Sequence, residues 1–110
     1  MNATPHISSS PDSTGNDLKD LHRECFACGQ VSESGLQLHF YVQPDGVASA
    51  VWHPLTEFRS YPDRVHGGII ATLLDSAIVH ALFAKGVVGV TAECTIRYRN
   101  SVSVTEPVHI

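Results

Sequence analysis

A histidine, two glycines and an aspartate are the residues of this 110-residue chain whose types and spacing predict chemistry. His66, Gly67 and Gly68 come directly before a long apolar run, and Asp75 interrupts that run. Glycines let the backbone approach a ligand closely, and the first amides of a helix have no intrahelical acceptor. Such amides favour an oxygen atom that develops negative charge. The pattern therefore predicts that the helix start polarises a carbonyl group while Asp75 serves as a general base or nucleophile.

A plainer interpretation of Asp75 stays open, because an acidic residue at the edge of an apolar stripe is ordinarily solvated or paired in a salt bridge. Helix geometry adds a constraint. Gly68 and Asp75 are seven residues apart in the sequence, so they would lie on nearly the same helix face but about 10 Å apart along the axis. One small carbonyl group cannot contact both. If both act on one substrate, a second copy of the chain must contribute.

The element that would hold these residues is one largely buried helix, which starts after His66 and stops at Gly86, a residue type that commonly ends helices. Asp75, His80 and Lys85 interrupt the apolar run before about 18 residues accumulate, so we predict no membrane span. Apolar side chains would cover about half of the helix circumference: Ile70, Leu73, Leu74, Ala77, Ile78, Ala81, Leu82 and Ala84.

Strand patterns lie on both sides of this helix. Residues 36–42 alternate apolar and polar side chains, residues 44–46 are the turn sequence Pro-Asp-Gly, and residues 47–52 would return as the second strand of a hairpin. Residues 54–63 form a loop with two prolines that leads to His66. The order strand, strand, helix, strand indicates an α+β domain.

The segment that follows the helix predicts the direction of Thr91. One row of this segment is apolar and should pack on the helix: Val90, Ala92, Cys94, Ile96 and Tyr98. Thr91 would then point away from its own helix. It is either a β-favouring surface residue or a residue that meets only the active site of a partner chain.

Composition and charge limit the classes of protein to which the chain can belong. The formal net charge of −4 gives no footprint for a nucleic-acid partner. Three cysteines indicate a reducing compartment, so we predict a cytoplasmic protein. Residues 1–20 are polar and lack a signal sequence, which predicts a disordered leader before a single domain over residues 21–110. About 90 residues make a marginal core, which favours a homo-oligomer.

A short cysteine motif stands near the start of that domain. Cys25 and Cys28 have the spacing of metal ligands, and His22 is close to them in the sequence. A closed zinc site needs about four ligands, and the chain offers no second cysteine pair. A redox role would need a βαβ pattern that does not follow. We therefore predict no metal site and expect this segment to pack in the core with Phe26 as its anchor.

Together these residues resemble the hotdog-fold acyl-CoA thioesterases, in particular the phenylacetate-pathway (PaaI-like) type. That group typically carries His-Gly-Gly, a hydrophobic helix and an Asp nine residues after the His, as between His66 and Asp75. The motif Cys25-Phe26-Ala27-Cys28-Gly29 looks like an N-terminal signature of one branch, and residues 90–99 look like the strand after the helix. The resemblance covers about residues 22–110.

The resemblance implies an antiparallel sheet wrapped around one long central helix, with thioester hydrolysis at the interface of a homodimer or homotetramer and no cofactor. By carry-over, the Gly67 amide would polarise the thioester carbonyl, and His66 would orient the loop or the substrate. Asp75 of the partner chain would activate water or attack directly, and Thr91 would lie beside that water. The family normally continues with at least two more strands after position 110, so the sheet is expected to be incomplete at its C-terminal end.

The loop and the second glycine would complete the site that the resemblance implies. Gly68 would bind substrate at the helix start, together with Ser60, which stands where related enzymes often have Asn or Gln. Phe58 and Tyr61 would form part of the pocket wall, or they would anchor a long loop.

Two further functions stay open beside the thioesterase. A hotdog module that binds acyl-CoA or a protein partner without catalysis would have the same fold. A hotdog dehydratase or hydratase also uses a His paired with an acidic residue, although the His-Gly-Gly helix start argues against it.

Overall fold

The computed structural model describes residues 2–11 and 15–110, with side chains described from Leu18 onward, and its central element is the helix α1, Gly67–Phe83. His66 is the N-cap, which confirms the predicted start. Gly86 takes a positive φ of 73° just beyond the C-cap Ala84, so the chain turns where the sequence predicted. No helix in the described part of the chain is long and apolar enough to cross a membrane.

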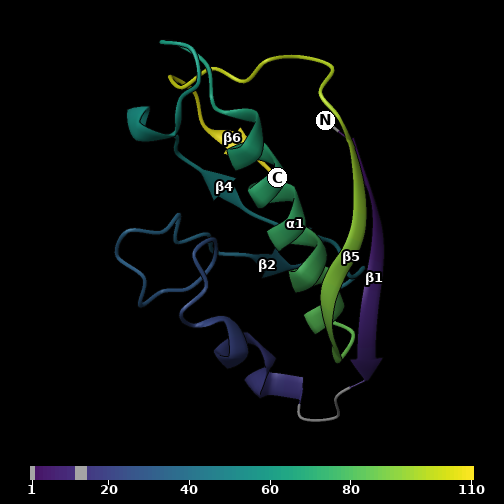
Figure 1. Ribbon diagram of the computed structural model, residues 1–110. Coiled ribbons are helices and arrows are strands. Elements are labelled where there is room, and N and C mark those ends of the chain that lie inside the picture. The colour runs from purple at the N-terminus through teal and green to yellow at the C-terminus, as the bar shows by residue number, and fades with distance from the viewer. Residues whose placement is uncertain (1, 12–14) are drawn as a thin grey trace.

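Antiparallel ladders lie on two sides of α1 (Figure 1). The long ladder follows one side of the helix, and the short strands β2, β4 and β6 lie on the other. Among the described residues there is one α-helix and the strand pairing is antiparallel throughout, which confirms the α+β prediction. Three pairs form these ladders: β1 (Asn2–Pro11) with β5 (Val87–Arg97), β2 (Tyr41–Val42) with β3 (Ala48–Ser49), and β4 (Val51–Trp52) with β6 (Val108–His109).

The N-terminal segment differs from the expected disordered leader. Residues 2–11 form β1, which runs antiparallel to β5, and the 3₁₀ helix η1 follows at Gly15–His22. The polar composition of the segment gave no signal for this, because a ladder is made by backbone groups. The edge of β5 presents unpaired N–H and C=O groups that an extended segment of almost any sequence can satisfy.

The core lies between α1 and the segment that the sequence predicted as a hairpin. Leu36, Leu38 and Phe40 are buried while the residues between them are exposed, so the predicted alternation is confirmed over residues 36–40, whereas Val42 is exposed. The ladder itself is shorter than predicted. Gln37 has a positive φ of 51°, and the amides of Leu36 and Leu38 donate to the carbonyls of residues 26 and 27 instead of to a neighbouring strand.

The cysteine segment packs on this core, but not through Phe26. The Phe26 side chain is 49% exposed, whereas Ala27 and Cys28 are buried. The expectation that Phe26 anchors the segment is therefore wrong. The tight turn from Cys25 to Gly29 directs the small side chains inward, and the large ring is left on the outside.

Candidate active site

The start of α1 is built by His66, which satisfies most of the first helix amides. Its Nδ1 accepts a hydrogen bond from the Gly68 amide at 2.8 Å. Its carbonyl accepts from the amides of Ile69 and Ile70 at 3.0 and 3.2 Å. No residue that the structure describes accepts from the remaining amide of the first four, that of Gly67. The donor left for an external oxygen atom is therefore Gly67 N–H.

Gly67 and Gly68 differ in how much space the structure leaves for a side chain. A Cβ atom at Gly68 would lie 3.1 Å from Nδ1 of His66, so a side chain there would push the capping ring away. A Cβ atom at Gly67 would have only the Tyr98 ring within 4 Å among the described atoms, at an ordinary 3.5 Å. Packing within one chain therefore disfavours a side chain at Gly68 and leaves room for one at Gly67.

Tyr98 completes the helix start and was not predicted as a site residue. Its hydroxyl donates to the Gly67 carbonyl at 3.0 Å, from the position directly after β5. The sequence pattern placed Tyr98 in an apolar row, and nothing local indicated which end of the helix its hydroxyl would reach. The contact orients the peptide group between residues 67 and 68, whose N–H donates to Nδ1 of His66.

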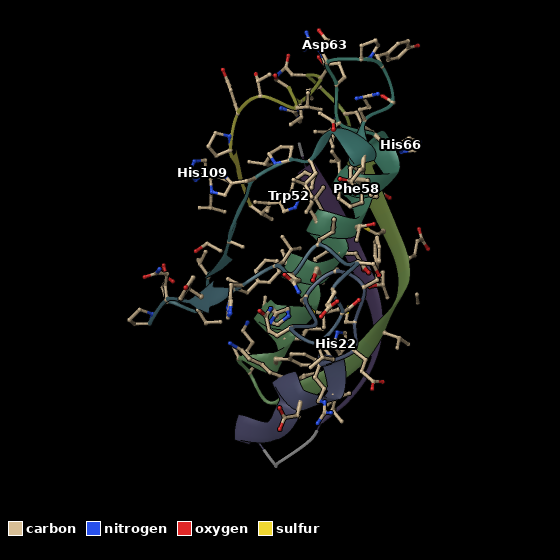
Figure 2. The ribbon with its side chains drawn as sticks, turned by 90° about the vertical axis from the view of Figure 1, so that its left-hand side faces the viewer. His22, Trp52, Phe58, Asp63, His66 and His109 are labelled. Atoms are coloured by element: carbon tan, nitrogen blue, oxygen red, sulfur yellow. The ribbon has the colours of Figure 1, made fainter. Side chains whose placement is uncertain are left out.

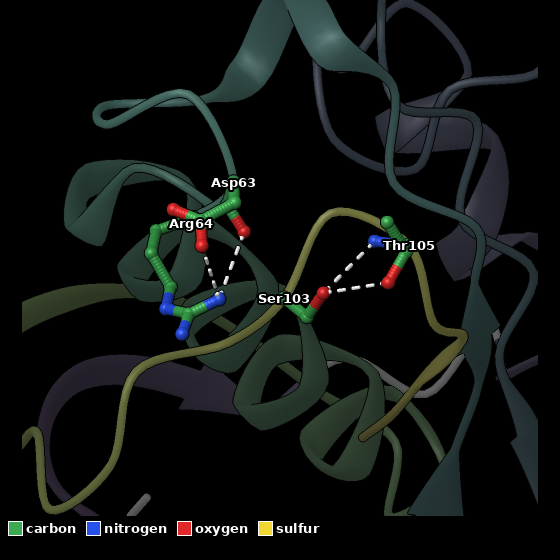
Figure 3. A network of polar contacts seen from close by, with 4 residues as sticks. All are labelled: Asp63, Arg64, Ser103 and Thr105. Atoms are coloured by element: carbon green, nitrogen blue, oxygen red, sulfur yellow. Dashed lines mark hydrogen bonds and ion pairs between the residues drawn. The ribbon is translucent and has the colours of Figure 1, made fainter.

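The loop before His66 is held by the segment that follows β5. The Val65 amide donates to the Val102 carbonyl at 2.8 Å, and the Val104 amide donates to the Asp63 carbonyl at 3.2 Å. Figure 3 shows the polar contacts that stiffen both segments: Arg64 Nη1 lies 3.1 Å from the Asp63 carboxylate, and the Ser103 hydroxyl lies 2.8 Å from that of Thr105. These contacts fix the backbone from which His66 caps the helix.

Asp75 lies about two turns inside α1, with its carboxylate exposed. It accepts a hydrogen bond from the Thr91 hydroxyl of the same chain. Both residues line an open cavity of about 410 Å³, together with Ala71, Thr72, Cys94 and Ile96. The arrangement presents one carboxylate, held by a hydroxyl group, on a wall of small and apolar side chains that also holds Thr72.

Thr91 faces its own helix, so the prediction that it points away from α1 is wrong. In the ladder with β1, residue 6 pairs with Glu93 and residue 7 pairs with Thr91, which leaves Ala92 as an extra residue on β5. Such a β-bulge shifts the alternation of side chains by one residue. Thr91 therefore shares a face with Cys94, while Val90 is 71% exposed.

The predicted substrate-binding residues of the loop lie apart from Asp75 within one chain. The Phe58 ring packs against Trp52, with centroids 6.0 Å apart (Figure 2), and the Phe58 carbonyl accepts from the His66 amide at 2.8 Å. Phe58 thus anchors the loop. Ser60 and Tyr61 are exposed, and neither lines the cavity beside Asp75. Their contact with substrate stays a prediction.

A second set of polar groups lies toward the other end of α1 and is buried. His80 is 5% exposed, and neither of its ring nitrogens has a hydrogen-bond partner among the described residues. Its ring stacks on Phe40 at 4.7 Å. Burial, followed by nearby cationic groups, lowers the pKa of His80 to about 4. No role was predicted for His80 from the sequence, because its burial depends on a contact with Phe40, which belongs to a distant segment of the chain.

Comparison with known proteins shows a similarity over the second half of the domain. Residues 63–110 match the family model of the thioesterase superfamily. This stretch holds the helix start, Asp75 and Thr91, so the described geometry falls within the matched part of the chain. The predicted fold class, a hotdog fold with one α-helix and antiparallel strands among the described residues, is confirmed.

Among curated proteins, the chain is similar to an uncharacterized protein from Schizosaccharomyces pombe. The two are 32% identical over 63 residues, which is 54% of this chain and 36% of the yeast protein. The chain therefore matches only about a third of the length of that relative. No solved structure matches the chain significantly.

Proposed function

We propose that this protein hydrolyses acyl-CoA thioesters to a free carboxylic acid and coenzyme A. The observation that carries the proposal is a pair of features on one helix: a Gly67 amide without an acceptor among the described residues, and an open Asp75–Thr91 pair further along. A thioester is already activated, so a polarised carbonyl and one carboxylate suffice without a cofactor. The superfamily match spans both features and supports this chemistry.

The proposed reaction assigns one step to each group. The Gly67 amide binds the thioester oxygen and stabilises the negative charge that develops there. Asp75 takes a proton from water as the water oxygen attacks the carbonyl carbon, or attacks that carbon directly to give an anhydride that water then opens. The carbon–sulfur bond breaks, and the coenzyme A thiolate takes up a proton. Thr91 donates to one carboxylate oxygen and leaves the other to act.

His66 has a positioning role in this scheme. Because its Nδ1 accepts from Gly68, the neutral ring carries its proton on Nε2. The ring is exposed, so Nε2–H is a donor that can bind substrate. The capping nitrogen is already occupied, which leaves Asp75 as the base.

Two copies of the chain are required by the proposal. Gly67 and Asp75 are eight residues apart on α1, or about 12 Å along the axis. One carbonyl group and its attacking water cannot reach both, so each site would combine Gly67 of one copy with Asp75 of another. We propose a homodimer or homotetramer of the PaaI-like type, located in the cytoplasm.

The test is hydrolysis of several acyl-CoAs, with the released thiol measured by a thiol reagent. Asp75→Asn should lower kcat by about a thousandfold, the order expected for loss of a general base, with an unchanged melting temperature because the side chain is exposed. Glu93→Gln is the matched control, an exposed acid two residues after Thr91 on β5, and should retain full activity. If Asp75→Asn hydrolyses at the parent rate, the mechanism is wrong.

A second function, acyl-CoA binding without catalysis, is favoured by one observation. In one chain, Ser60 and Tyr61 lie away from the cavity beside Asp75, so a substrate wall must come from elsewhere. Calorimetry on the same acyl-CoAs separates the two functions. Binding by the parent protein without thiol release would support the binding module and overturn the hydrolase.

A further inference from the structure

Three side chains that bind metals well come together near the other end of α1. His22 is the last residue of η1, and Cys25 and Cys28 lie in the turn after this helix. Their ligand atoms all lie within 4.8 Å of one another. Figure 2 shows His22 at the opposite end of the molecule from His66. The cluster is therefore separate from the proposed hydrolase site, and its argument does not depend on that activity.

The spacing within the cluster fits a single tetrahedral cation. The Cys28 sulfur lies 3.6 Å from Nδ1 of His22. A zinc ion at ordinary Zn–S and Zn–N distances would hold such a pair about 3.6 Å apart in tetrahedral geometry. The two atoms, which form a hydrogen bond in the metal-free chain, need almost no movement to share a metal.

The turn that carries the cysteines is rigid. The Ala27 amide donates to the Cys25 sulfur at 3.4 Å, and the Gly29 amide donates to the Cys25 carbonyl at 2.8 Å. A Cβ atom at Gly29 would lie 2.5 Å from the Arg23 carbonyl oxygen, so only glycine closes this turn. The ligands are thus held in place before any cation arrives.

A cavity beside the cluster offers room for a fourth ligand. It has a volume of about 210 Å³ and is lined by His22, Cys28 and His80 among others. The His80 ring lies 6.5 Å from that of His22, centroid to centroid, and its buried nitrogens have no partner among the described residues. A buried imidazole without a partner is costly, and a metal-bound water in this cavity would supply one.

We propose that His22, Cys25 and Cys28 bind one zinc ion, with the fourth coordination position open to this cavity. Two sulfur atoms and one imidazole form a donor set that suits zinc. Burial raises the pKa of the Cys28 thiol to about 11, yet a thiol loses its proton outright when it coordinates a divalent cation. The ion would tie η1 to the cysteine turn and so stabilise a small domain.

Metal analysis and cobalt titration of the reduced 110-residue chain test the site. Protein expressed with added zinc should contain one zinc per chain and neither copper nor iron. After removal of zinc by a chelator, Co²⁺ should bind with the same stoichiometry and give thiolate-to-cobalt absorption together with tetrahedral d–d bands. Absence of both zinc and the thiolate band in the reduced parent chain would overturn the proposal, as would a copper or iron content in place of zinc.

Matched variants decide which residues bind. Loss of a residue that only orients a ligand costs 10–100-fold in affinity, so Cys25→Ser and His22→Gln should each weaken Co²⁺ binding by more than about 100-fold. Cys94→Ser, a cysteine on β5, and His53→Gln, an exposed imidazole after β4, should bind like the parent. Equal losses in Cys94→Ser and Cys25→Ser would refute the assignment. Since Cys28 is buried, the parent titration and Cys25→Ser decide the outcome even if Cys28→Ser fails to fold.

Discussion

The polar groups toward the two ends of α1 differ in their exposure and in their hydrogen bonding. His66 at the N-terminal end and Asp75 about two turns further along are exposed, and each makes a hydrogen bond to a neighbour. Toward the C-terminal end, His80 is buried and its ring has no partner among the described residues. Exposed polar groups are solvated at little cost, whereas buried ones need a partner. Changes at the first end should therefore alter activity, and changes at the second should alter stability.

Glycines show the same contrast between these regions. At Gly29, beside the cysteines, a Cβ atom would collide with backbone on two sides, at 2.5 Å from both Arg23 O and Cys25 N. At Gly67, a Cβ atom would make one ordinary contact with a Tyr98 ring. The first glycine is required to close a turn. The second is not required by the packing of its own chain, as expected if a substrate approaches the Gly67 amide closely in the proposed site.

The largest expected effect comes from mixing two inactive variants. Asp75→Asn lacks the proposed base, and Gly67→Val blocks the proposed oxygen-binding amide. If one site combines Gly67 of one copy with Asp75 of another, co-expressed variants should form mixed dimers with one intact site. Random pairing gives about a quarter of the parent activity, a rise of more than about 100-fold over either variant alone. Co-expression that leaves activity at the level of the single variants would show that each site belongs to one chain.

Local patterns predicted α1 and its start, and long-range contacts decided the rest. The helix period and the His-Gly-Gly cap depend on residues close in sequence, so both could be predicted. The contact between Thr91 and Asp75 could not, because it depends on a bulge at Ala92 set by the register with β1. The burial of His80 likewise depends on Phe40. A pattern along one segment carries no information about which distant segment will cover it.

A smaller effect separates the two glycines. Gly29→Ala should lower the free energy of unfolding by about 3 kcal/mol, the upper range for a single substitution that strains the backbone. Gly67→Ala, at the first helical position, should change it by less than about 1 kcal/mol while lowering kcat on acyl-CoA. Urea denaturation of both variants measures the first quantity, and thiol release from Gly67→Ala measures the second. A Gly67→Ala protein with parent kcat would remove the proposed role of that amide.

The smallest expected effect is the change in the free energy of unfolding when His80 is replaced by leucine. The sign of this change shows whether the buried ring lacks a hydrogen-bond partner. In metal-free protein, His80→Leu removes two buried nitrogens without partners among the described residues and keeps an apolar contact with Phe40. Replacing an unsatisfied buried polar group by an apolar one should raise the free energy of unfolding by about 1 kcal/mol. His39→Leu, an exposed imidazole, is the control and should leave it nearly unchanged. If His80→Leu instead destabilises the metal-free chain, the imidazole is bonded to water or another group in the cavity. The two ends of α1 would then differ in the exposure of their polar groups but not in whether those groups are hydrogen-bonded.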